Sequence, residues 1–72
     1  MTAHWLIRIG DNASVLGELH FPGSKLAAVR CFNRVVRTEK SSRRVDWPVF
    51  VDLFQMDGGL PASKATKSEV VS

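Results

Sequence analysis

The sequence predicts a small α+β domain, in which one amphipathic helix packs on one face of a three-stranded antiparallel sheet. Three observations predict this class: two alternating segments within residues 4–21, a segment of helical period over 25–39, and a third apolar segment over 45–56. The order strand, strand, helix, strand is that of a two-layer sandwich. The helix then crosses the sheet and brings the third strand beside the first.

Residues 4–10 and 15–21 are predicted to form a β-hairpin, because apolar and polar residues alternate in both segments. The residues between them, 11–14, include Asp and Asn, whose side chains satisfy backbone groups in turns. Charge and burial agree on one pairing register, which places Arg8 opposite Glu18. The same register aligns two apolar pairs, Trp5 with Phe21 and Ile7 with Leu19.

A helix is predicted over residues 25–39, after the strand-breaking pair Pro22-Gly23 and after Ser24, a favourable N-cap. At about 100° per residue, the apolar and basic side chains of this segment fall on two different arcs. The helix is therefore amphipathic, with one apolar face and one cationic face. The apolar arc consists of Ala28, Val29, Phe32, Val35 and Val36, with Cys31 at its edge.

The third strand is predicted within residues 45–56, with its regular part after Pro48, because proline cannot donate to a ladder. The turn residues 57–59 end it. Residues 61–72 are polar, small and weakly patterned, so we expect a disordered tail there. The expected organisation is a single α+β domain over residues 1–60, followed by this tail.

Positive charge is concentrated on the predicted helix and on the loop after it. Residues 30–44 hold six of the ten Lys and Arg residues but one of the seven acids, in a chain of net charge +3. Such asymmetry predicts an anionic partner, with nucleic acid preferred because guanidinium groups match phosphate oxygens. A solvated or intramolecularly paired helix face is the alternative interpretation. The candidate contacts are Arg30, Asn33, Arg34, Arg37, Lys40, Arg43, Arg44 and Trp47.

Apolar surface is expected on the sheet face away from the helix, because one helix covers one face only. Outer faces of antiparallel sheets are usually polar, whereas this one is half apolar. The chain is therefore predicted to form a homodimer through this face or through an edge strand, with the third strand involved, or to dock a partner protein on this face. The candidate interface residues are Leu6, Leu16, Phe50 and Phe54.

Catalysis is not expected, since no nucleophile lies in a motif and the chain has no glycine-rich phosphate loop. His4 and His20 share a face of the predicted hairpin but lack a third ligand, so neither a metal nor another cofactor is predicted. No small-molecule substrate is expected either. One cysteine, Cys31, favours a reducing, cytoplasmic setting, and no apolar run is long enough to predict a membrane span.

A second function is compatible with the same features. The chain would be a protein-binding inhibitor or adaptor that docks on an acidic or nucleic-acid-binding surface of a host protein complex. In size and in lack of catalytic motifs, it resembles small phage or mobile-element proteins that bind and block host machinery, a comparison of general character only. A structural homo-oligomer with a solvated basic face is a third possibility. Binding to nucleic acid at physiological salt separates the first function from the others.

Overall fold

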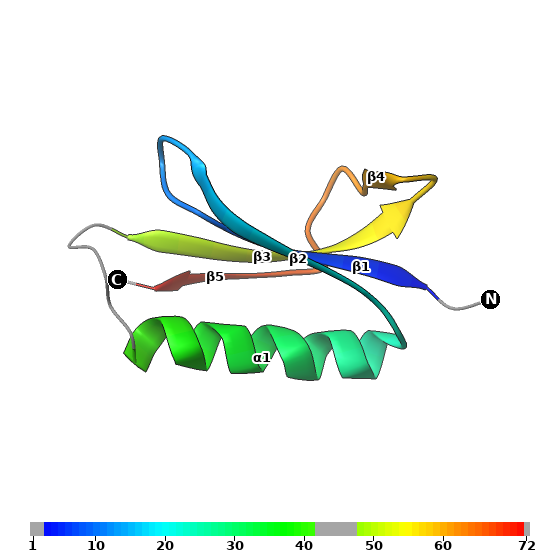
Figure 1. The fold of residues 1–72 in the computed structure, drawn as a ribbon, viewed down its shortest axis with the longest axis horizontal. Helices are drawn as coiled ribbons and strands as arrows, with labels where there is room; N and C mark the ends of the chain where they lie inside the picture. The colour runs from blue at the N-terminus through cyan, green and yellow to red at the C-terminus, as the bar shows by residue number, and fades with distance from the viewer. Residues whose placement is uncertain (1–2, 42–47, 72) are drawn as a thin grey trace.

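One helix packs against one face of an antiparallel sheet, which gives two layers (Figure 1). A computed structural model describes residues 3–41 and 48–71. The α+β class, the hairpin and the helix that the sequence predicts are confirmed. In chain order the elements are β1 (His4–Gly10), β2 (Val15–Pro22), α1 (Lys25–Ser41), β3 (Val49–Asp57), β4 (Leu60–Pro61) and β5 (Lys67–Val71).

The hairpin of β1 and β2 has the predicted register. Arg8 pairs with Glu18, and its Nε donates a hydrogen bond to Glu18 Oε2 over 3.1 Å. In the turn, the Asp11 carboxylate accepts hydrogen bonds from the backbone N–H groups of Ala13 and Ser14, both at 2.8 Å. Local charge pairing and local turn chemistry therefore determine this part of the fold.

The sheet has five strands rather than three, so the predicted strand number is wrong. β3 pairs with β1 along one edge, while β4 and β5 share its other edge. The chain reverses after β3 through Gly58 and Gly59, whose φ angles are 60° and 86°. Two consecutive positive φ angles are typical of a type I′ hairpin turn, which glycine adopts at little cost. This turn brings the rest of the chain back along β3.

β5 lies in the segment 61–72, where the sequence predicts a disordered tail. Its pairing with β3 extends from Lys67, opposite Leu53, to Val71, opposite Val49. Val71 is buried, with 5% of its surface exposed. Backbone hydrogen bonds need no side-chain periodicity, so a polar, weakly patterned segment satisfies the open edge of β3. The expectation of a tail does not fit this arrangement.

The core lies between α1 and the sheet. The helix contributes the centre of its predicted apolar arc, and the sheet contributes one face of β1, β3 and β5. At the edge of this core, Trp5 Nε1 donates a hydrogen bond to the carbonyl oxygen of Gly23 over 2.8 Å, which ties β1 to the start of the helix. The buried core residues are Trp5, Ile7, Ala28, Phe32, Val36, Val49, Val51, Leu53 and Val71.

Ser24 caps the helix as predicted, because its Oγ accepts a hydrogen bond from the N–H of Ala27 over 3.2 Å. Ser24→Ala should lower the free energy of unfolding by about 1 kcal/mol, as measured by urea denaturation. Thr38→Ala is the control. Thr38 Oγ1 donates to the Arg34 carbonyl on the exposed side of the same helix, where alanine is at least as favourable. Equal losses in the two variants would contradict the capping role.

Candidate nucleic-acid interface

The polar and basic side chains of α1 that lie off its apolar arc are exposed. We use "basic face" for Arg30, Asn33, Arg34, Arg37 and Lys40. Arg30, Arg34 and Arg37 lie on the arc opposite Phe32, which is fully buried, and Asn33 and Lys40 lie at the flank of this arc. Within residues 3–41 and 48–71, Arg8 forms an ion pair with Glu18. No ion pair within these residues involves the four cations of the basic face.

β5 adds a fifth cation, Lys67, beside the basic face. Its Nζ donates a hydrogen bond to Asn33 Oδ1 over 3.2 Å and lies 5.6 Å from the centroid of the Phe32 ring. Sequence reasoning missed Lys67 because it placed this residue in a tail. No local pattern marks it, since its position depends on the long-range pairing of β5 with β3.

The bond to Lys67 changes the expected role of Asn33. Reading adenine requires both the amide oxygen and the amide nitrogen of an asparagine side chain. Here the oxygen already accepts from Lys67. The amide nitrogen of Asn33 remains as a donor, and an amide N–H can bond to a phosphate oxygen as well as to a base. The Asn33 side chain therefore lacks the unoccupied acceptor that reading adenine would require.

One apolar side chain, Leu26, lies at the start of the basic face, one helical turn before Arg30. It is 63% exposed. The remaining candidates, Arg43, Arg44 and Trp47, lie outside the residues that the structure describes.

The candidate protein-interface residues are not equally accessible. On the sheet face opposite the helix, Leu6 lies between its ladder partners His20 and Phe54 and is 1% exposed. Phe54 is half-buried, and the Arg8 guanidinium carbon lies 5.4 Å from its ring centroid. Phe50 is half-buried too, whereas Leu16 is exposed. Leu6 therefore offers almost no surface to a partner, and a cation partly covers Phe54.

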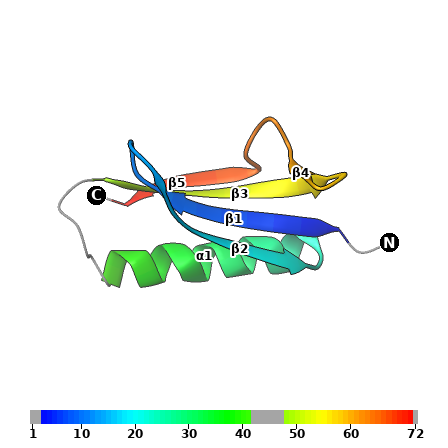
Figure 2. The same cartoon turned by 45° about the horizontal axis from the view of Figure 1, so that its top comes forward.

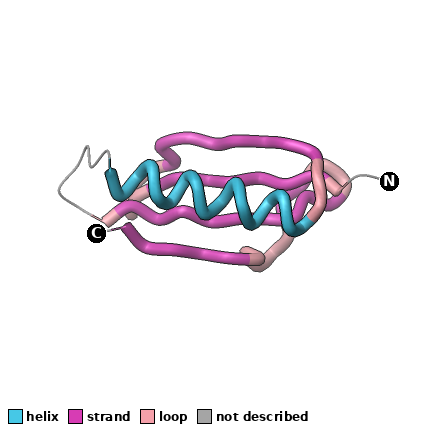
Figure 3. The backbone as a smooth tube through the Cα atoms, turned by 90° about the horizontal axis from the view of Figure 1, so that it is seen from below, coloured by secondary structure: helices cyan, strands magenta, loops and turns pink. Residues whose placement is uncertain are grey.

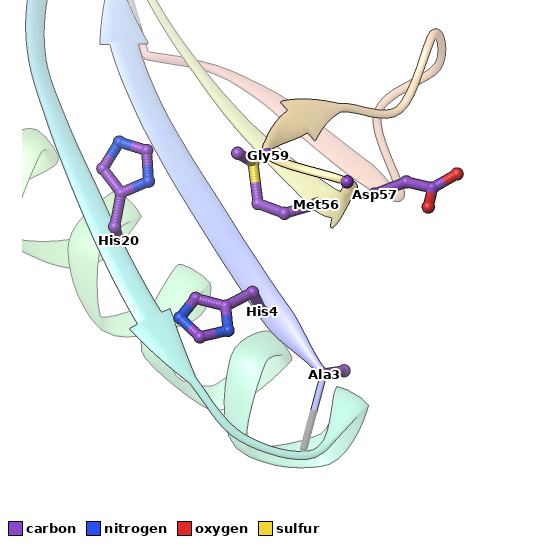
Figure 4. A pocket seen from close by; sticks show the side chains of 7 residues that line it. Ala3, His4, His20, Met56, Asp57 and Gly59 are labelled. Carbon is purple, nitrogen blue, oxygen red and sulfur yellow. The ribbon is translucent and has the colours of Figure 1, made fainter. Parts of the chain in front are cut away.

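A hollow of about 620 Å³ opens on the same sheet face, at the end where β3 turns into β4. In Figure 4, His4 and His20 reach it from neighbouring strands, and Met56 and Asp57 lie across from them. The described residues contain no cluster of three or more His, Cys, Asp or Glu residues that could hold a metal ion. The hollow therefore presents two imidazoles and a thioether without the ligand set of a zinc site.

Comparison with known proteins finds no family model, no curated protein and no solved structure that matches this chain. Among the described residues, no helix combines the length and the apolar character that crossing a bilayer requires.

Proposed function

We propose that this protein is a non-enzymatic binding protein of the cytoplasm that holds nucleic acid through the basic face of α1 and Lys67. The observation that carries this proposal is a set of five exposed cations on one surface, none of which is in an ion pair within the described part of the chain. A surface on which cations outnumber acids attracts a polyanion.

The spacing of the arginines suits a phosphate backbone. From Arg30 to Arg37 the helix rises about 10 Å, at 1.5 Å per residue. This length corresponds to about three base steps of a duplex strand, at 3.4 Å per step. Each guanidinium group presents a fork of donors to phosphate oxygens and releases counterions on contact. Because the Asn33 oxygen is already bonded to Lys67, binding is expected to depend little on base sequence.

The second candidate function is that of an inhibitor or adaptor that docks its basic face on an acidic protein surface. Leu26 favours it, because an exposed leucine beside a cationic stripe is an anchor for a protein pocket rather than a phosphate contact. This function predicts no binding to nucleic acid at physiological salt, and it requires Leu26 for binding to the protein partner.

The test of nucleic-acid binding is the affinity for a labelled duplex and a labelled single strand, measured by fluorescence anisotropy across a salt series. Arg34→Glu combined with Arg37→Glu should weaken binding at least about tenfold. It should also reduce the slope of log affinity against log salt by about 2 for duplex, since two phosphate contacts are lost. Both residues are exposed and lie off the apolar arc, so the fold should be retained.

The matched control is Lys25→Glu combined with Lys64→Glu. Both lysines are exposed and lie outside the basic face, and the change in net charge is the same. This control should retain most of the affinity. Equal losses in the two double variants would mean that only net charge matters, and the basic face would not be the binding site. Failure of the unaltered protein to bind at physiological salt would leave the adaptor function in its place.

A further inference from the structure

β2 lies at one end of the sheet, where its second edge faces away from the other strands. The strand order is β2-β1-β3, followed by β4 and β5, and within the described residues no strand pairs with the outer edge of β2 (Figure 2). The helix packs mainly on β3 and β5 and leaves β2 to its side (Figure 3). An eight-residue strand is therefore open along its backbone and is not covered by the helix.

This edge is also apolar. Val15, Leu16 and Leu19 are 54%, 47% and 45% exposed, and they are three of the six large hydrophobic residues exposed in the described part of the chain. Proteins usually protect an edge with lysine, proline or short strands. β5, at the opposite end, is protected in this way, since it has five residues, including Lys67 and Glu69. β2 is longer, with eight residues, and its protection consists of Glu18, Pro22 and a register shift opposite Gly10.

We propose that β2 pairs antiparallel with β2 of a second copy of this chain, around a twofold axis at Leu19. In this register Leu19 faces Leu19 of the second copy. Glu18 of each copy faces His20 of the other copy, so that each carboxylate has an imidazole N–H donor across the interface. Moving the axis to Glu18 would instead set two carboxylates opposite each other. The strand is thus self-complementary in hydrogen-bond donors and acceptors in the register centred on Leu19.

Gly17 provides an independent observation. A Cβ atom at this position would have no heavy atom within 4 Å, and its φ is not positive. Nothing within one copy of the chain therefore requires glycine there, although glycine weakens a strand interior. In the proposed register Gly17 lies opposite Phe21 of the second copy. The missing side chain leaves room for the half-buried Phe21 ring to lie over the partner strand.

The twofold axis is perpendicular to the sheet, so both copies of α1 lie on the same side of one continuous sheet. If the proposed function holds, two basic faces then point in the same direction, and one nucleic acid is able to contact both. This consequence rests on the proposed function, whereas the pairing itself does not. Measurements of assembly without nucleic acid therefore test the pairing separately.

The first experiment measures mass by light scattering and sedimentation at micromolar to millimolar concentration. The unaltered chain should reach the mass of a dimer, about twice 8.0 kDa. Leu19→Lys sets two cations on the axis and should raise the dissociation constant of the dimer at least about tenfold. Val70→Lys is the control, since Val70 is 53% exposed on the opposite edge strand. A monomer at all concentrations, or dissociation by Val70→Lys and not by Leu19→Lys, would overturn the proposal.

The second experiment tests the register by oxidative cross-linking in a Cys31→Ser background. Leu19→Cys should cross-link, because residues paired across antiparallel strands have Cα atoms about 4.5–5.5 Å apart, within disulfide reach. Val15→Cys should not, since its copies would lie about 27 Å apart along the strands. Cross-linking at position 17 instead of 19, with Gly17→Cys, would refute the register. Equal cross-linking at 15 and 19 would indicate random collision and would also count against it.

Discussion

Deletion of β5, from Lys67 onward, is expected to abolish cooperative unfolding of this protein. The deletion removes the strand that pairs with the first half of β3, and it removes Val71 from the core. Burying a valine side chain contributes about 1.5–3 kcal/mol, and a domain of this size has only about 3–5 kcal/mol in total. The loss is therefore comparable to the whole stability. Thermal unfolding followed by circular dichroism measures it.

Two point variants show whether β5 acts through packing. Val71→Asp places a carboxylate in the core and should be as damaging as the deletion. Val70→Asp changes the neighbouring residue, which is 53% exposed, and should have a small effect. If the truncated chain melts like the full chain, and both aspartate variants behave alike, then residues 61–72 form the tail that the sequence predicts.

Phe32→Ala is expected to cost about 3–5 kcal/mol of folding free energy, because the ring is fully buried and its loss leaves a cavity. Phe32 is also the largest fully buried side chain, and Lys67 lies over its ring. The variant should be unfolded, or nearly so, in water. Urea denaturation and the dispersion of amide proton signals are the measurements.

A milder substitution at the same position keeps the loss of folding free energy measurable. Phe32→Leu retains most of the buried volume and should cost less than about 2 kcal/mol, within the range of urea denaturation. Phe54→Ala removes a ring of the same kind from the opposite, half-buried face of the sheet and should cost less than Phe32→Ala. If Phe54→Ala were the more damaging of the two, the main core would lie on the sheet face opposite the helix, which contradicts this prediction.

The hairpin and the helix were predictable from local patterns in the sequence. The register of β1 and β2 follows from alternation together with one charge pair, Arg8 and Glu18. The start of α1 follows from Ser24, and its buried side follows from helical period. All these features depend on interactions between residues that are close together in the chain, and short stretches of sequence are therefore enough to predict them.

The outer face of the sheet could be predicted only in part. Both faces of β3 are apolar, and the sequence left open which of them the helix covers. Pairing with β1 decides this, because it sets Leu53 beside Ile7 on the helix side and Phe54 beside Leu6 on the other. The burial of Leu6 follows from the same pairing, since both of its ladder neighbours are large.

By itself, the sequence determined the α+β class, the hairpin register, the helix with its two faces, and the positions of the helix cations. Only the tertiary structure decided that β5 fills the open edge of β3 and that Lys67 reaches Asn33. The physical reason is that side-chain periodicity reports burial within one element. The pairing of β5 with β3 depends instead on backbone hydrogen bonds between separate segments, which leave little trace in the polar sequence of β5.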